Sequence, residues 1–185
     1  MNKTILSVLK SIEEYSKNHS DVFPISFDQG NFLAELITSN KASMCLELGV
    51  SHGYSTIFQA HALKGKGKLI AIEMNSAKIE LATKNLKKCE LLDVVDIKWG
   101  SAQKIIPKLN EMFDIVFMDH LKDQYVNCFD LLFDKIKING IIVADNMLSH
   151  QEECLPYQDY VRSHPDFVSF LVPLGNGFEL SIRKQ

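Results

Sequence analysis

The chain has 185 residues, of which 46% are hydrophobic and 23% charged, and its formal net charge is −3. This composition excludes a disordered chain, and the length predicts one globular domain over residues 1–185. The weakly acidic balance offers no bulk attraction to nucleic acid, which would need a local basic patch to bind. Charged residues interrupt the amino-terminal apolar residues, so we expect neither a secretion signal nor a membrane span, and we predict a cytoplasmic protein.

The four cysteines do not form a metal-binding pattern. Cys45, Cys89, Cys128 and Cys154 are far apart in the chain, and none belongs to a CxxC or Cys/His motif of the kind that binds zinc. We therefore expect reduced thiols that act as small hydrophobic side chains.

Hydrophobic periodicity predicts an alternation of helices and strands. Two helices come first, one carrying Ile5 to Tyr15 and the other carrying Phe32 to Ile37. Short apolar runs then predict strands at 44–49, 68–73, 94–99, 113–119 and 140–145. The helices predicted between these strands cover 54–64, a segment starting at Asn75 or Ser76, 102–110, and a segment from Tyr125 to Ile136. Two final strands, 167–172 and 177–182, flank a Pro/Gly/Asn turn and predict an antiparallel hairpin.

The fold class follows from this order of elements. Runs such as IVFM and IIVA lack polar alternation, which is typical of parallel strands covered by helices on both faces. We predict an α/β fold with a doubly wound, mostly parallel, Rossmann-like sheet and an antiparallel C-terminal hairpin. Such sheets bind ligands at the carboxyl ends of their strands, so the residues at those ends are the candidates for a site.

Polar and acidic residues close the predicted strands. They are Glu47, Gly49, Glu73, Gly100, Asp119, Asp145 and Asn146. Each acidic residue alone is also consistent with capping the helix that follows it. Several carboxylates at one rim repel one another, however, and a cation or a hydroxyl-rich ligand would offset that repulsion.

The turn after the first strand, ELGVSHGYS (47–55), indicates a nucleoside ligand. Gly49 and Gly53 let the backbone turn tightly and approach a ligand. The turn lacks the GxGxxG spacing and a phosphate-binding lysine, which disfavours dinucleotides and nucleoside triphosphates. Glu73, at the end of the next strand, is placed to accept hydrogen bonds from both hydroxyls of a ribose. An adenosine without phosphates fits this pattern, and S-adenosylmethionine (SAM) is such a ligand.

Asp119, Asp145 and Asn146 supply oxygen ligands from two strand ends that we expect to be neighbours. Oxygen ligation without thiol or imidazole selects a hard cation, Mg²⁺ before Ca²⁺ or Mn²⁺. His120 is not expected to be a ligand. Lys122 is either a solvent-exposed lysine or, partly desolvated beside a divalent metal, a base that works near neutral pH.

These motifs resemble the metal-dependent O-methyltransferases related to catechol O-methyltransferase and the caffeoyl-CoA enzymes, and most of all the catechol branch. LELGVSHGYS resembles the family's cofactor loop, LIAIEMN its ribose-binding strand end, GSAQKIIPKL its adenine-side segment, FMDHLKDQY its metal and base motif, and ADN its second metal motif. The resemblance spans nearly the whole chain. It implies a class I SAM methyltransferase, with residues 1–40 covering the cofactor, that methylates a hydroxyl of a small catechol-like or other vicinal-oxygen acceptor.

Carried over by position, the resemblance also implies roles for individual residues. Asp119, Asp145 and Asn146 would bind Mg²⁺, and Lys122 would take the hydroxyl proton. Met74 and His120 would flank the adenine, whose edge Gln103 would reach. The full set of implied SAM-binding residues is Ile25, Glu47, Gly49, Ser51, Gly53, Tyr54, Ser55, Glu73, Met74, Gly100, Ala102, Gln103, Asp119 and His120.

Departures from the family concentrate on the acceptor side. Leu121 stands where the catechol enzyme has a tryptophan, and Phe170 stands near the place of a glutamate that contacts the catechol hydroxyl. In the cofactor site, Ser51 and Ala102 replace a tyrosine and a serine. The departures at Leu121 and Phe170 leave open a non-catalytic SAM-binding protein. A second alternative is methylation of a hydroxylated uridine in tRNA, since enzymes that resemble this family act there. The sequence is compatible with a monomer and with a homodimer.

Overall fold

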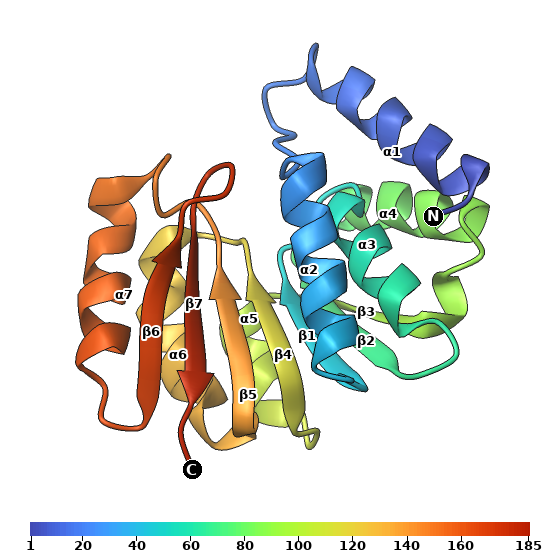
Figure 1. The fold of residues 1–185 in the computed structure, drawn as a ribbon. Helices are drawn as coiled ribbons and strands as arrows, with labels where there is room; N and C mark the ends of the chain where they lie inside the picture. Colours follow the sequence, from blue (N-terminus) through green and yellow to red (C-terminus); the bar gives the residue numbers. More distant parts are fainter.

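The computed structural model describes residues 1–185, which form a seven-stranded sheet in the order β3-β2-β1-β4-β5-β7-β6 (Figure 1). The first five strands pair in parallel, whereas β7 is antiparallel to both β5 and β6. The strands are β1 (Met44–Leu48), β2 (Lys68–Glu73), β3 (Val95–Trp99), β4 (Phe113–Met118), β5 (Ile136–Ala144), β6 (Phe167–Val172) and β7 (Phe178–Arg183). This arrangement confirms the predicted fold class, including the C-terminal hairpin.

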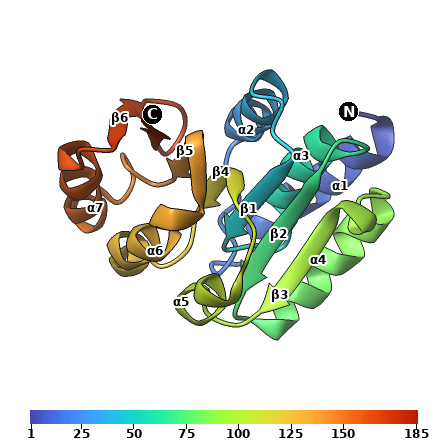
Figure 2. The same ribbon diagram turned by 90° about the horizontal axis from the view of Figure 1, so that it is seen from below.

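Helices cover the sheet from two sides, as Figure 2 shows from below. One side carries α1 (Lys3–Ser16), α2 (Phe27–Ser39), α3 (Tyr54–Leu63) and α4 (Ser76–Lys88). The other side carries α5 (Ala102–Ile105), α6 (Tyr125–Leu132) and α7 (Gln151–Ser163). Four short 3₁₀ turns complete the chain at Leu92–Val94, Ile106–Lys108, Lys122–Gln124 and Phe133–Lys135. None of the helices is long and apolar enough to cross a bilayer.

Alternate residues of each central strand point into different hydrophobic cores, because side chains alternate across a sheet. In β1, Cys45 joins the core beneath α1 to α4, while Leu46 and Leu48 join the core beneath α5 to α7. The position between the two leucines is taken by a charged residue, Glu47, which is fully buried. Burial on both faces explains the continuous apolar runs of the sequence.

Several predicted bounds differ from the structure. The helix predicted over 102–110 is α5 followed by a 3₁₀ turn that ends at Lys108, and α6 ends at Leu132, so Ile136, predicted as helical, is a strand residue. Strand β5 begins at Ile136, four residues before the predicted start, because Ile136 already pairs with Phe113 of β4 across a register irregularity. Helix α7 was not predicted, since Pro156 lies inside it and its mean hydropathy is low. Its buried residues Cys154, Tyr157 and Val161 nevertheless follow the spacing of a helix that packs on one face.

Candidate functional site

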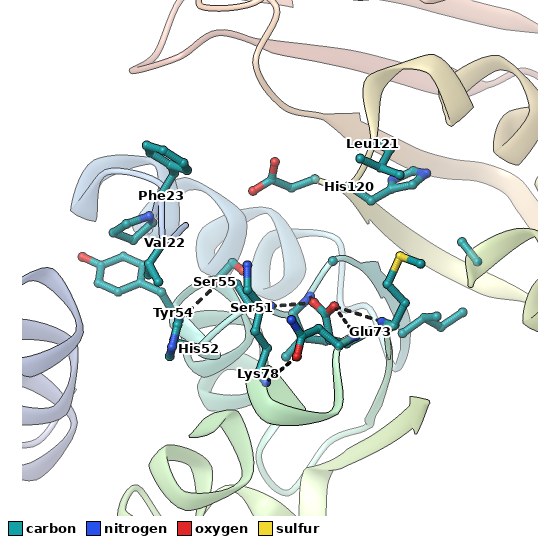
Figure 3. A pocket seen from close by; sticks show the side chains of 18 of the residues that line it. Val22, Phe23, Ser51, His52, Tyr54, Ser55, Glu73, Lys78, His120 and Leu121 are labelled. Carbon is teal, nitrogen blue, oxygen red and sulfur yellow. Dashed lines mark hydrogen bonds between the residues drawn. The ribbon is translucent and has the colours of Figure 1, made fainter. Parts of the chain in front are cut away.

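A cavity of about 360 Å³ opens at the carboxyl ends of β1, β2 and β4, where the topology predicts a ligand site (Figure 3). Most of the predicted SAM-binding residues line it. These are Ile25, Gly49, Ser51, Tyr54, Ser55, Glu73, Met74, Gly100, Ala102, Asp119 and His120. The predicted residues Glu47, Gly53 and Gln103 do not line it.

The turn between β1 and α3 brings the backbone against the end of β4. Gly49 has φ +94°, and a Cβ added there would lie 2.2 Å from the carbonyl oxygen of Asp119. Only glycine permits this approach. Gly53, also at positive φ, is the N-cap of α3, and no side chain caps the helix. The first N–H groups of α3 are therefore left for an anionic ligand group.

Glu73 has a structural role that the sequence did not reveal. Its Oε2 accepts hydrogen bonds from the backbone N–H groups of Val50 and Ser51, at 3.1 and 3.0 Å. Its Oε1 accepts from those of Met74 and Asn75, both at 2.9 Å. The carboxylate therefore holds the glycine turn against the end of β2, in addition to facing the cavity where a ribose is expected.

Glu47 lies behind the cavity wall. It is fully buried and accepts hydrogen bonds from the hydroxyls of Ser55 and Thr56 at the start of α3. Burial raises the pKa of Glu47 to about 8, although the two hydroxyls oppose the shift. Glu47 therefore supports Ser55, which does line the cavity, and does not itself contact the space expected for the methionine part of SAM.

The segment between α1 and α2 covers the cavity. Val22, Phe23, Pro24 and Ile25 all line it, as does Ile12 of α1. Two side-chain contacts tie this segment and the preceding helix α1 to the body of the protein. The Tyr54 hydroxyl donates to Glu13, and Lys78 Nζ donates to the carbonyl oxygen of Asp21 at 2.8 Å.

On the side expected for adenine, His120 and Met74 both line the cavity. Burial, followed by the charge of Lys122, lowers the pKa of His120 to about 4, so the imidazole is neutral at pH 7. Its buried Nδ1 has no hydrogen-bond partner in the chain, which leaves a polar atom for a ligand. Gln103 is exposed outside the cavity, whereas the nearby Ser101 lines it.

The predicted metal ligands meet next to this cavity. Met118 pairs with Ala144, so Asp119 and Asp145 follow paired positions on adjacent strands. Asp145 is 1% exposed, and its pKa is raised by burial and then by the charge of Asp119. Asn146 is 8% exposed and has φ +73°, a left-handed conformation that asparagine tolerates better than most residues.

Each carboxylate of this pair receives one side-chain donor. Lys122 Nζ donates to Asp119 Oδ1 at 3.0 Å and to the carbonyl oxygen of His120 at 3.0 Å. Gln29 Nε2 donates to Asp145 Oδ1 at 3.0 Å. The second oxygen of each carboxylate accepts no hydrogen bond from another side chain. The side-chain amide nitrogen of Asn146 donates to the Ser149 hydroxyl at 3.2 Å, which leaves Asn146 Oδ1 available.

This donor set fits a hard divalent cation. Burial and then repulsion from Asp119 raise the pKa of Asp145; a cation would offset the repulsion, and carboxylate and amide oxygens are the ligands such ions prefer. No group of three or more histidine, cysteine, aspartate or glutamate side chains is arranged to hold a metal. The predicted trio contains only two carboxylates, and its third donor is the amide oxygen of Asn146.

Two residues, Gln29 and Tyr125, were not predicted from the sequence to belong to the site. Gln29 comes from α2, 116 positions before the carboxylate that it contacts, and no local pattern marks it. Tyr125 is fully buried, and its hydroxyl donates to the carbonyl oxygens of Met118 at 3.0 Å and Asp145 at 3.4 Å. Tyr125 therefore ties together the ends of β4 and β5. Phe170, expected near the acceptor, lies on edge strand β6 and does not line the cavity.

Comparisons with known proteins agree with this geometry. A family model described as O-methyltransferase matches residues 2–169. A caffeoyl-CoA O-methyltransferase of Eucalyptus gunnii is 31% identical over an alignment of 201 positions, gaps included, which covers 96% of this chain and 81% of that protein. Caffeoyl-CoA O-methyltransferase 2 of Petunia hybrida is 31% identical, with coverage of 86% of this chain and 71% of that protein.

Solved structures share the fold over the whole chain. The O-methyltransferase of Bacillus cereus in complex with SAH has a TM-score of 0.87 at 21% identity, covering 100% of this chain and 92% of that one. An SAH-bound methyltransferase of Podospora anserina has a TM-score of 0.89 at 18% identity, covering 100% and 89%.

Proposed function

This chain belongs to the O-methyltransferase family and is a SAM-dependent enzyme of the caffeoyl-CoA type, and from that premise we propose its acceptor class and its metal. We propose that it methylates one of two neighbouring oxygens of a small catechol-like acceptor and that it requires a divalent cation, with Mg²⁺ the first choice. We further propose that the residues lining the cavity bind SAM, and that one domain in the cytoplasm carries the activity.

The observation that carries this proposal is the pair of carboxylates beside the cofactor cavity. Asp119 lines the cavity and also belongs to the pair, so one residue borders both the SAM space and the metal space. One buried and one partly buried carboxylate with one lysine and one amide donor carry excess negative charge, which a divalent cation would neutralise. The names of the relatives point the same way, because a caffeoyl group carries two neighbouring hydroxyls.

The rim of the cavity suits an aromatic acceptor. Leu121, next to the metal ligands, is 54% exposed, and Phe23 of the cover is 78% exposed. Figure 3 shows these two apolar side chains on opposite sides of the opening. An aromatic ring that covers either side chain would remove apolar surface from water, which favours binding.

The reaction transfers a methyl group from the SAM sulfur to the acceptor oxygen. Asp119, Asp145 and Asn146 would hold the cation, which when bound polarises the acceptor hydroxyl. Lys122 is only 12% exposed and, as the neutral amine, would take the hydroxyl proton on the Nζ lone pair, while its two N–H groups can keep the contacts to Asp119 and to the carbonyl oxygen of His120. The bond between sulfur and methyl breaks as the bond between oxygen and methyl forms, leaving S-adenosylhomocysteine. The cover formed by Val22 to Ile25 would keep water away from the reacting atoms.

The test measures methyl transfer from radiolabelled SAM to a catechol, with and without EDTA and after return of Mg²⁺. We expect EDTA to abolish turnover and Mg²⁺ to restore it. Loss of a residue that hydrogen-bonds to a metal ligand costs roughly 10–100-fold in activity, and Asp145→Ala should lower turnover by more than that because it removes a ligand itself. Calorimetry should show SAM binding largely intact. Asp130→Ala, at an exposed position on α6, is the matched control and should keep full activity. Full activity in excess EDTA would refute the metal role.

A parallel assay with bulk tRNA addresses the nucleic-acid alternative. If tRNA is methylated and no catechol or hydroxycinnamate of a panel is, the proposed acceptor class is wrong and the metal role still stands. The net charge of −3 gives no general attraction to tRNA, so we expect the small acceptors to be methylated.

A further inference from the structure

Gln29 is a buried polar residue that the proposed reaction does not use. It lies in the first turn of α2 and is 0% exposed. Its Nε2 donates to Asp145 Oδ1 at 3.0 Å, and its Oε1 accepts from the backbone N–H of Ser26 at 3.1 Å. Its own backbone N–H donates to the Ser26 hydroxyl at 3.1 Å, which completes a capping box. Both ends of the amide are therefore occupied.

The surroundings of Gln29 leave its side chain no alternative position. The β6–β7 turn packs directly against it, since a Cβ added at Gly175 would lie 2.4 Å from Gln29 Oε1. Because Oε1 is held by Ser26 and backed by Gly175, the amide nitrogen must point toward Asp145. The orientation is set by the fold and not by Asp145 alone.

We propose that Gln29 is a positioning residue for the metal site, which holds Asp145 by its Oδ1 and leaves Oδ2 to face the cation. This inference rests on the proposed metal role of Asp145. It assigns to Gln29 the outer-shell contact that metal-binding carboxylates commonly receive. Lys122 makes the equivalent contact to Asp119, so each carboxylate of the pair is held by one side-chain donor.

The same residue links the metal site to the cofactor cover. Ser26, whose backbone N–H donates to Gln29 Oε1, directly follows Ile25, a residue that lines the cavity. A displaced Gln29 amide would therefore affect both Asp145 and the end of the cover. Separating these two effects requires variants that remove one contact at a time.

The test is a calorimetric titration of metal-free protein with Mn²⁺ alone, which gives the Mn²⁺ dissociation constant. Gln29→Met keeps the length of the side chain and removes the donor, and we expect the Mn²⁺ dissociation constant to rise about 10–100-fold. Ser26→Ala removes only the cap hydroxyl at an exposed position and should lower the melting temperature without changing Mn²⁺ affinity. Gln59→Leu replaces another glutamine that is 0% exposed and whose side chain makes no hydrogen bond, and it should also leave Mn²⁺ affinity unchanged.

Gln29→Glu provides a second measurement at nearly constant shape. It replaces the donor with a carboxylate that faces Asp145, so the metal-free variant should melt below wild type, and saturating Mn²⁺ should raise its melting temperature more than that of wild type. Wild-type Mn²⁺ affinity in Gln29→Met, or an unchanged response to Mn²⁺ in Gln29→Glu, overturns the positioning role. Absence of Mn²⁺ binding to wild type overturns the proposed metal site, and the role of Gln29 with it.

Discussion

Replacing Gly49 with alanine tests whether the close approach of β1 and β4 holds the site together. The new methyl group would lie 2.2 Å from the carbonyl oxygen of Asp119, closer than real Cβ contacts. The backbone of Asp119 would have to move, and its carboxylate would move with it. We therefore expect Gly49→Ala to weaken SAM binding and turnover together, in addition to lowering stability.

The size of the stability loss follows from two contributions. A non-glycine residue held at φ +94° costs about 1–3 kcal/mol. Forcing a methyl group into a filled space costs about 1–3 kcal/mol more. The sum of about 2–6 kcal/mol is a large share of the 5–15 kcal/mol that typically separates folded from unfolded protein.

Gly65→Ala is the matched control, because Gly65 has φ +74° but no atom within 4 Å of an added Cβ. It carries the conformational cost without the contact. Urea unfolding followed by circular dichroism should therefore show Gly49→Ala less stable than Gly65→Ala by about 1–3 kcal/mol. A difference below about 0.5 kcal/mol would refute the reasoning, since it is within the scatter of neutral surface changes.

Three further predictions concern single side chains. Lys122→Met should lower kcat about 10²–10⁴-fold while calorimetry shows unchanged SAM affinity; unchanged kcat would remove Lys122 as the base. Glu73→Gln leaves backbone N–H groups of the turn without acceptors and should raise the SAM dissociation constant about 10–100-fold. The control Glu80→Gln, on the exposed face of α4, should leave that constant unchanged. Burial alone would raise the pKa of Glu179, but hydrogen bonds from Arg162, Ser169 and Gln158 outweigh burial and lower the pKa. The stability that these hydrogen bonds provide is therefore present above about pH 4 and is lost as the pH falls through the folded-state pKa. Arg162→Met should therefore be less stable than wild type in urea at pH 7 by about 1–3 kcal/mol, with a gap that closes below pH 4; a gap independent of pH would contradict this assignment.

The sheet was predictable from the sequence because burial on both faces leaves a local record. Strand β2 was predicted with the bounds it has, and the apolar run of β4 with one residue too many. Helix α7 left no such record, since Pro156 interrupts a pattern whose apolar residues are few. It forms because Cys154, Tyr157 and Val161 find a core supplied by α6 and the C-terminal hairpin.

The sequence by itself determined which residues end the strands, and with them the candidate ligands Asp119, Asp145 and Asn146, because parallel strands bring their carboxyl ends to one edge. Only the tertiary structure decided how those residues are held. Gln29 reaches Asp145 from 116 positions away, Glu73 turns back to the backbone of Val50 and Ser51, and Glu47 lies behind Ser55. Contacts between distant segments leave no periodic pattern in the chain, since they depend on how helices and turns pack around the sheet and not on local spacing.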